Sequence, residues 1–225
     1  MAKEKKMHKG TFFVMVFLAV LATCLIVEYN TLFFSTFLDN RIEKHKTDIH
    51  YLKAESYPLH FVITDRKSTN TEKEDVISAK VSFYTADNIM ITEPSTYIIR
   101  GKEVFFDFII VEKKEGSKLV FPYSIFSDTI APDDAIFIAP LYNIKGFPAI
   151  FGRSKATGLS DISTGSNEFD KELSAIYADI LKRKELKNSY GNAVHDTCKL
   201  GAFIVGQEYR VLVHTKGGIE IVMGE

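Results

Sequence analysis

The sequence predicts an α+β fold: an N-terminal transmembrane helix and a short helical stalk, then a mainly antiparallel β-sheet domain with one long amphipathic helix packed on it. Three observations predict it. Residues 11–27 contain no charged side chain. Between residues 59 and 126, short β-branched and aromatic runs follow one another with only turns or a polar loop between them. Residues 168–187 instead show the apolar period of a helix.

The uncharged run predicts a membrane-spanning signal anchor over residues 11–30. A spanning helix needs about 20 mainly apolar residues, and Leu32, Phe33 and Phe37 extend the apolar surface beyond the run. Residues 1–10 carry four lysines against one glutamate, so the positive-inside tendency places this basic leader in the cytoplasm. We therefore expect a single-pass membrane protein with an extracytoplasmic C-terminal domain.

Two alternatives treat the same run as a cleaved signal. A secretory signal peptide has an apolar core of about 7–15 residues and an A-x-A-like cleavage site. This run is longer, and no A-x-A sequence lies near its end. The segment LATC, which ends at Cys24, resembles the bacterial lipobox, whose cysteine is acylated after cleavage. Thr23 departs from the usual small residue, and Leu25 follows where a polar residue is normal, so an uncleaved anchor fits better.

Residues 31–55 are predicted to continue the helix outward as a stalk. An apolar seam with heptad-like spacing runs through it and is formed by Leu38, Ile42, His45, Ile49 and Leu52. The seam over residues 38–52 either lies against the protein's own domain or joins two copies in a coiled coil. Pro58 ends the helix, because the residue before a proline disfavours the α conformation. The extracytoplasmic domain is expected to span residues 56–225.

The first half of this domain reads as consecutive strands. They are predicted at residues 59–64, 79–85, 96–100, 103–112 and 118–126. The third and fourth are expected to form a hairpin around Gly101 and Lys102, and residues 113–117 form the next turn. Short connections favour antiparallel pairing. Pro122 inside the last run indicates an edge position or a β-bulge.

The second half is expected to contain a long loop, a helix and a final hairpin. Residues 127–167 are rich in proline and glycine and read as loop. The helix over 168–187 has one apolar stripe and can be capped by Ser166 or Asn167. Its stripe is formed by Phe169, Leu173, Ile176, Tyr177, Ile180 and Leu181. The last strands are predicted at residues 202–205, 209–215 and 219–223, with the final turn at 216–218.

Charge and composition exclude some classes of function. Without the leader, the chain has 24 basic and 28 acidic side chains, a net charge of −4, with lysines scattered along it. This lacks the basic footprint of a nucleic-acid-binding protein. Cys198 is the single cysteine after the anchor, so no disulfide can form within the domain. Eighteen Phe and ten Tyr without Trp suit an aromatic-rich sheet core.

No residue pattern predicts a catalytic or metal site. His195 and Cys198 could form a nucleophilic dyad, but a turn with a buried cysteine explains them better. The six histidines show no H-E-x-x-H and no zinc-ligand spacing, and His214 reads as a half-exposed strand residue. We therefore expect no catalytic residue, no metal and no cofactor, and a non-enzymatic domain rather than an enzyme.

The loop over residues 152–167, GRSKATGLSDISTGSN, is the one stretch that suggests a ligand. Glycines and hydroxyls that lead into a helix N-terminus can cradle an anion. Glu168 and Asp170 oppose this, because they place two carboxylates in the first turn. The candidate binding residues are Asp161, Thr164, Gly165 and Ser166.

Within this loop, the segment DISTGSN resembles the flavin-attachment motif of the FMN-binding domains of membrane redox complexes. That motif reads roughly Asp-x-x-Ser-Gly-Ala-Thr, with the flavin esterified to the threonine. Asp161, Thr164 and Gly165 match, whereas Ser166 replaces the alanine and Asn167 stands at the threonine position. Asn cannot carry a phosphoester, so the covalent attachment of that family is not expected here.

Two functions are therefore expected as alternatives. The first is a binding or scaffolding role for the membrane-anchored domain, with the membrane and either a protein partner or a second copy through residues 38–52 as its contacts. The second is a small-molecule or flavin-like cofactor site in the 152–167 loop, because loops carry function more often than strands.

Overall fold

The computed structural model places the C-terminal part of the chain, and its described residues are 21, 55–67, 75–113, 116–131, 134–155, 158–186, 189–190, 203–214 and 217–224. The chain divides between Lys46 and Thr47, and the fold below is that of the second part. The expected leader, anchor and stalk lie outside the described residues, apart from the helical Leu21 and from Glu55, the last residue of the expected stalk, which is not helical. Within the described ranges, no helix is long and apolar enough to cross a membrane.

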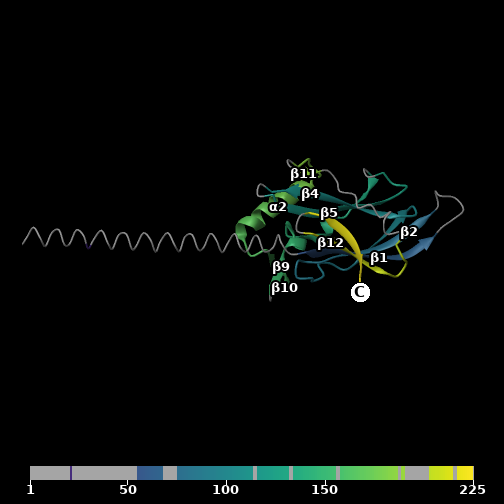
Figure 1. Ribbon diagram of the computed structural model, residues 1–225, viewed down its shortest axis with the longest axis horizontal. Helices are drawn as coiled ribbons and strands as arrows, with labels where there is room; N and C mark the ends of the chain where they lie inside the picture. The colour runs from purple at the N-terminus through teal and green to yellow at the C-terminus, as the bar shows by residue number, and fades with distance from the viewer. Residues whose placement is uncertain are drawn as a thin grey trace, which may run out of the picture. The chain divides into compact units, whose positions relative to one another are not determined.

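Two larger antiparallel sheets, two small two-stranded pairs and one α-helix form the described part of the domain, together with short 3₁₀ helices (Figure 1). The larger sheet has the order β13-β12-β1-β2-β3. Its strands are β1 (Ser56–Lys67), β2 (Val76–Phe83), β3 (Ser95–Arg100), β12 (Glu208–Val213) and β13 (Ile219–Met223). The second sheet has the order β11-β4-β5-β6. Its strands are β4 (Val104–Glu112), β5 (Lys118–Ser127), β6 (Ile136–Phe137) and β11 (Ser189–Tyr190). The predicted mainly antiparallel β domain with one helix is confirmed.

The connection between β3 and β4 differs from the predicted hairpin. The two strands belong to different sheets, so residues 101–103 carry the chain from one layer to the other. The hairpin between β4 and β5 is present, with Glu112 opposite Lys118. Pro122 lies at a β-bulge in β5, one of the two positions expected for it. At this bulge, the Tyr142 hydroxyl donates a hydrogen bond to the Pro122 carbonyl at 2.8 Å.

Residues 127–167 are more ordered than the predicted loop. Their described residues contain two small antiparallel pairs and the 3₁₀ helices η3 and η4. These elements are η3 (Ala139–Tyr142), β7 (Asn143–Ile144), β8 (Phe147–Pro148), η4 (Ala149–Phe151), β9 (Arg153–Lys155) and β10 (Gly158–Ser163). Pieces of two to six residues carry too little periodicity to be read from sequence. The predicted strand at 202–205 is reduced to a single bridge between Val205 and Ile63.

The core lies between the two sheets. Alternate residues of β1 and β2 point into it, as the period of a half-buried strand requires. Phe61 of β1 lies 4.7 Å from Phe106 of β4, measured between ring centroids, and joins the sheets. Tyr209 stacks on the same Phe61 at 5.4 Å, and Phe203 meets it edge-on at 4.9 Å. These rings form one aromatic cluster of the core, in keeping with the composition.

The helix α2 (Asn167–Leu181) covers the end of the β4–β5 hairpin (Figure 1). Ser166 caps it by accepting a hydrogen bond from the Phe169 amide. It ends six residues earlier than predicted, because the chain turns at Arg183, whose φ is +53°. Lys113 lies over the Phe169 ring at 4.3 Å, and the buried Tyr177 donates to the Ala139 carbonyl at 2.6 Å.

Candidate functional site

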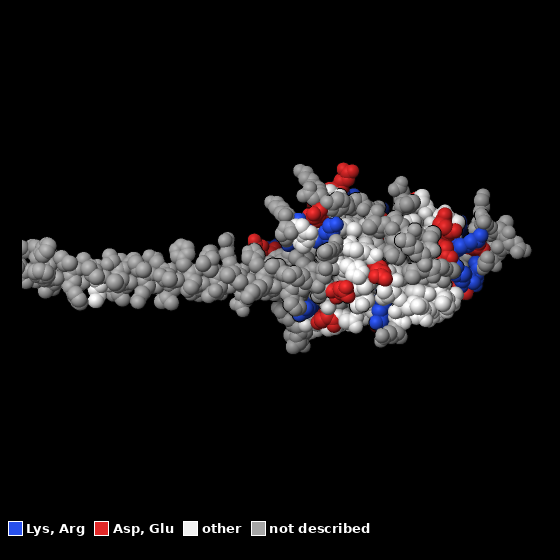
Figure 2. All heavy atoms as spheres, viewed as in Figure 1, with Lys and Arg blue, Asp and Glu red and all other residues white. Residues whose placement is uncertain are grey.

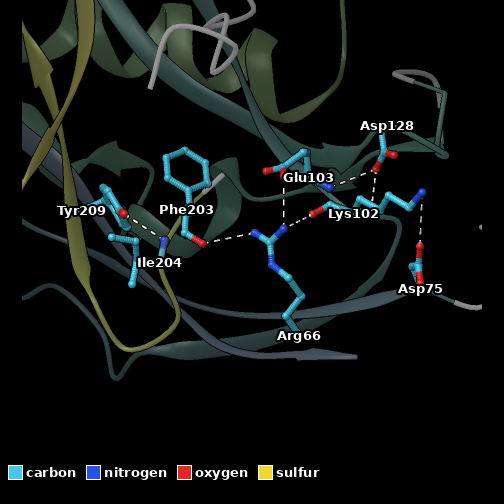
Figure 3. Close-up of polar contacts among 8 residues, drawn as sticks. All are labelled: Arg66, Asp75, Lys102, Glu103, Asp128, Phe203, Ile204 and Tyr209. Atoms are coloured by element: carbon cyan, nitrogen blue, oxygen red, sulfur yellow. Dashed lines mark hydrogen bonds and ion pairs between the residues drawn. The ribbon is translucent and has the colours of Figure 1, made fainter. Parts of the chain in front are cut away.

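A polar network that joins distant segments is centred on Arg66, near the end of β1 (Figure 3). Its Nη1 donates to the Lys102 carbonyl at 2.8 Å and to Glu103 Oε1 at 3.1 Å. Its Nη2 donates to the Phe203 carbonyl at 3.2 Å. One guanidinium therefore ties together three segments that are far apart in sequence, because its planar fork carries several fixed donors.

Asp128 holds the same 101–103 connection from the other side (Figure 3). Its Oδ1 accepts from the Lys102 amide at 2.7 Å and from the Glu103 amide at 3.1 Å. Lys102 Nζ lies 3.7 Å from Asp75 Oδ2, and the Gly101 amide donates to the Asp75 carbonyl at 2.8 Å. These contacts fix the crossing between the sheets, so the network acts as a structural clamp.

A shallow groove of about 490 Å³ adjoins this clamp. It is lined by Phe105, Phe126, Ser127, Asp128, Thr129, Ile130 and Ala131. Phe105 and Phe126 are a cross-strand pair whose rings stack at 5.5 Å between centroids. An apolar floor with a polar rim suits an apolar side chain of a ligand better than a charged one.

Asp107 is a buried carboxyl that the sequence analysis did not single out. It follows Phe105 on the same face of β4 and lies opposite Ser124 of β5. Its residue is 2 % exposed, and its Oδ1 has no hydrogen-bond partner. Burial raises the pKa of Asp107 to about 6, although hydrogen bonds from the Phe108 amide and the Ser124 side chain oppose the rise. The signal in sequence is one acid inside the apolar run VFFDFIIV.

Two histidines of the larger sheet have contrasting surroundings. His60 lies in β1, and His214 directly follows β12. His60 is buried, stacks on Tyr84 at 4.0 Å, and has Glu208 Oε1 2.9 Å from Nδ1 in a poor direction for a hydrogen bond. Burial lowers the pKa of His60, and the nearby Glu208 offsets this only in part. His214 is solvent-accessible, and hydrogen bonds with Glu220 and Glu55, each at 3.2 Å, raise its pKa.

These surroundings predict that the two imidazoles titrate on opposite sides of their ordinary pKa of 6.5, His60 below and His214 above. The measurement is an NMR pH titration of the ring carbon-bound protons, assigned with His60→Gln and His214→Gln. Glu220→Gln is expected to lower the midpoint of His214 and to leave that of His60 in place. Coincident midpoints in the unmodified chain would contradict the assignment of the two environments.

The predicted ligand loop contains β9 and β10 and leads into α2. The buried Thr164 donates to Asp170 Oδ1 through its amide at 2.9 Å and its hydroxyl at 2.7 Å. Ser166 caps the helix, Gly165 has a φ of +93°, and Asp161 is exposed in β10. The carboxylate of Asp170 thus lies where a bound anion would need the Thr164 donors. His195 and Cys198 lie outside the described residues.

The charges of the domain are mixed rather than gathered by sign. On the face seen in Figure 2, acidic and basic side chains lie among uncharged ones, and both signs meet at its right end. Across the described ranges, no group of three or more His, Cys, Asp or Glu side chains is arranged to hold a metal ion. Compared with known protein families, curated proteins and solved structures, the chain matches none.

Proposed function

We propose that this chain is a single-pass membrane protein whose extracytoplasmic domain binds or scaffolds a protein partner. The observation that carries the proposal is the uncharged run of residues 11–27 behind a leader with four lysines. Eleven of its 17 residues are Leu, Ile, Phe or Val. Each of these contributes about −0.3 to −0.6 kcal/mol to insertion at a helix centre. The leader faces the cytoplasm, and the domain lies on the opposite side of the membrane.

The domain supports the binding half of the proposal through its surface. Several polar groups of the domain are engaged in internal contacts. Arg66 and Thr164 donate hydrogen bonds within the domain, and the Asp128 carboxylate accepts one from the Lys102 amide. A large apolar side chain stands out from the edge of the sheet instead: Ile98 of β3 is 74 % exposed. An exposed edge strand with an apolar side chain offers a pairing surface to another chain.

Alkaline carbonate extraction tests the anchor. The full chain is expected to stay in the membrane pellet, whereas a chain with both Val20→Arg and Leu21→Arg is expected to move largely to the supernatant. Each central arginine costs about 2.5–3.5 kcal/mol of insertion free energy. Ile42→Arg, the same kind of change outside the run, is the control and should leave the pellet fraction unchanged. Release of the unmodified chain by carbonate would overturn the proposal.

A further inference from the structure

Strand β3 ends the larger sheet and has one neighbour. It pairs with β2 along its whole length, from Val81 opposite Ser95 to Val76 opposite Arg100. In the part of the chain that the structure describes, no strand pairs with its other side. An edge strand of this kind presents a row of main-chain donors and acceptors to an incoming chain.

The hydrogen-bond pattern shows which groups of β3 face outward. The Gly101 amide donates across to the Asp75 carbonyl, so bonding to β2 recurs at every second residue from there. Thr96, Ile98 and Arg100 therefore direct their main-chain groups away from β2. The Arg100 carbonyl confirms this, because it accepts from the side chains of Ser127 and Thr129, the latter at 2.9 Å. That contact closes one end of the edge and leaves Thr96 and Ile98 open.

The side chains beside this open edge are apolar at the centre and basic around it. Ile98 is 74 % exposed. Lys80, opposite Thr96 on β2, and Arg100 are also exposed on this face of the sheet. No ion pair among the described residues involves either cation. The acid in the same row of the sheet is Asp65, which lies opposite Ser78 and two strands from Ile98. It is 3.7 Å from Lys67. The edge thus offers two exposed positive charges around one exposed apolar side chain.

We propose that β3 is the docking edge for an extended acidic segment of a partner protein, which adds to the larger sheet as a further strand. This inference rests on the binding role proposed above and names its site. Main-chain bonds to Thr96 and Ile98 would hold the segment. Side chains two residues apart in a strand share a face. The matching pattern is therefore acid–x–apolar–x–acid. The apolar residue lies beside Ile98, one acid beside Arg100, and the other beside Thr96, one strand away from Lys80.

The probe is a labelled, end-capped peptide containing Glu-Thr-Val-Thr-Glu, and the reference is its charge-inverted form, Lys-Thr-Val-Thr-Lys. Fluorescence anisotropy with the detergent-solubilised full chain is expected to show saturable binding of the acidic peptide and at least tenfold weaker binding of the basic one. The double variant Lys80→Glu, Arg100→Glu is expected to reverse this order. Reversal identifies the basic residues beside β3 as the source of the preference.

Ile98→Pro tests the main-chain contact, because it removes an outward N–H and leaves the pairing with β2 intact. This variant is expected to weaken binding of the acidic peptide at least tenfold. Met223→Pro is the matched control, since the Gly224 amide donates to the Glu208 carbonyl and Met223 therefore faces outward on the opposite edge. Equal binding of both peptides, or equal loss in the two proline variants, would overturn the inference. Either result leaves carbonate extraction, which tests the anchor alone, unaffected.

Discussion

Replacing Gly101 with alanine is expected to lower the free energy of unfolding of the domain by about 3 kcal/mol. Gly101 has a φ of +128°, a conformation that residues with a side chain rarely adopt. An added Cβ would lie 2.5 Å from Asp128 Oδ1 and 2.7 Å from Ser127 Oγ. Asp128 must then move, which breaks its bonds to the amides of Lys102 and Glu103. Backbone strain and lost hydrogen bonds therefore both lower the free energy of unfolding.

Gly146→Ala separates these two causes. Gly146 also has a positive φ, +86°, but nothing lies within 4 Å of a Cβ placed there. This variant is expected to lose only the conformational part, about 1 kcal/mol. Urea unfolding of the detergent-solubilised chain, followed by near-UV circular dichroism of the tyrosines, measures both. Equal losses in the two variants would contradict the role given to Asp128.

Asp107→Asn is expected to remove a pH-dependent destabilisation. The pKa of Asp107 is about 6 in the folded chain, above its ordinary value of 3.8, so the folded state binds this proton more tightly than the unfolded state. The stability contributed by the protonated group is present below about pH 4 and is lost as the pH rises to about 6 and beyond. A shift of this size corresponds to at most about 3 kcal/mol.

The measurement is the difference in unfolding free energy between Asp107→Asn and the unmodified chain at pH 4 and pH 7.5. We expect this difference to move in favour of the variant by about 2–3 kcal/mol over that range. Asp65→Asn removes a charge of the same sign from an exposed position and controls for net charge. A difference that stays constant with pH would show that Asp107 is not held in the buried environment described.

The elements that the sequence predicted well are those with a clear period. The alternation in β1 and β2 and the stripe from Phe169 to Ile180 both report one buried face, which local pattern reveals directly. The assignment of β3 and β4 to different sheets had no such signal. Gly101 and Lys102 read as an ordinary turn, and the choice between a hairpin and a crossing depends on Asp128, 25 residues beyond Glu103.

The polar sites show the same limit. Thr164 and Ser166 are recognisable from sequence as hydroxyls at a helix start, but Asp170, one turn into α2, uses the Thr164 donors. Arg66 could not be recognised from sequence, since its partners lie 36, 37 and 137 residues away. Asp107 could have been singled out, because one acid flanked on both sides by apolar residues departs from the pattern of the strand.

The proposed topology is tested most directly by single cysteines in a chain that carries Cys24→Ser and Cys198→Ser. Glu93→Cys reports on an exposed position of the domain, and Lys3→Cys reports on the leader. A membrane-impermeant maleimide added to intact cells is expected to label Glu93→Cys at once and Lys3→Cys only after permeabilisation. Labelling of Lys3→Cys in intact cells, with Glu93→Cys protected until permeabilisation, would contradict the proposed orientation.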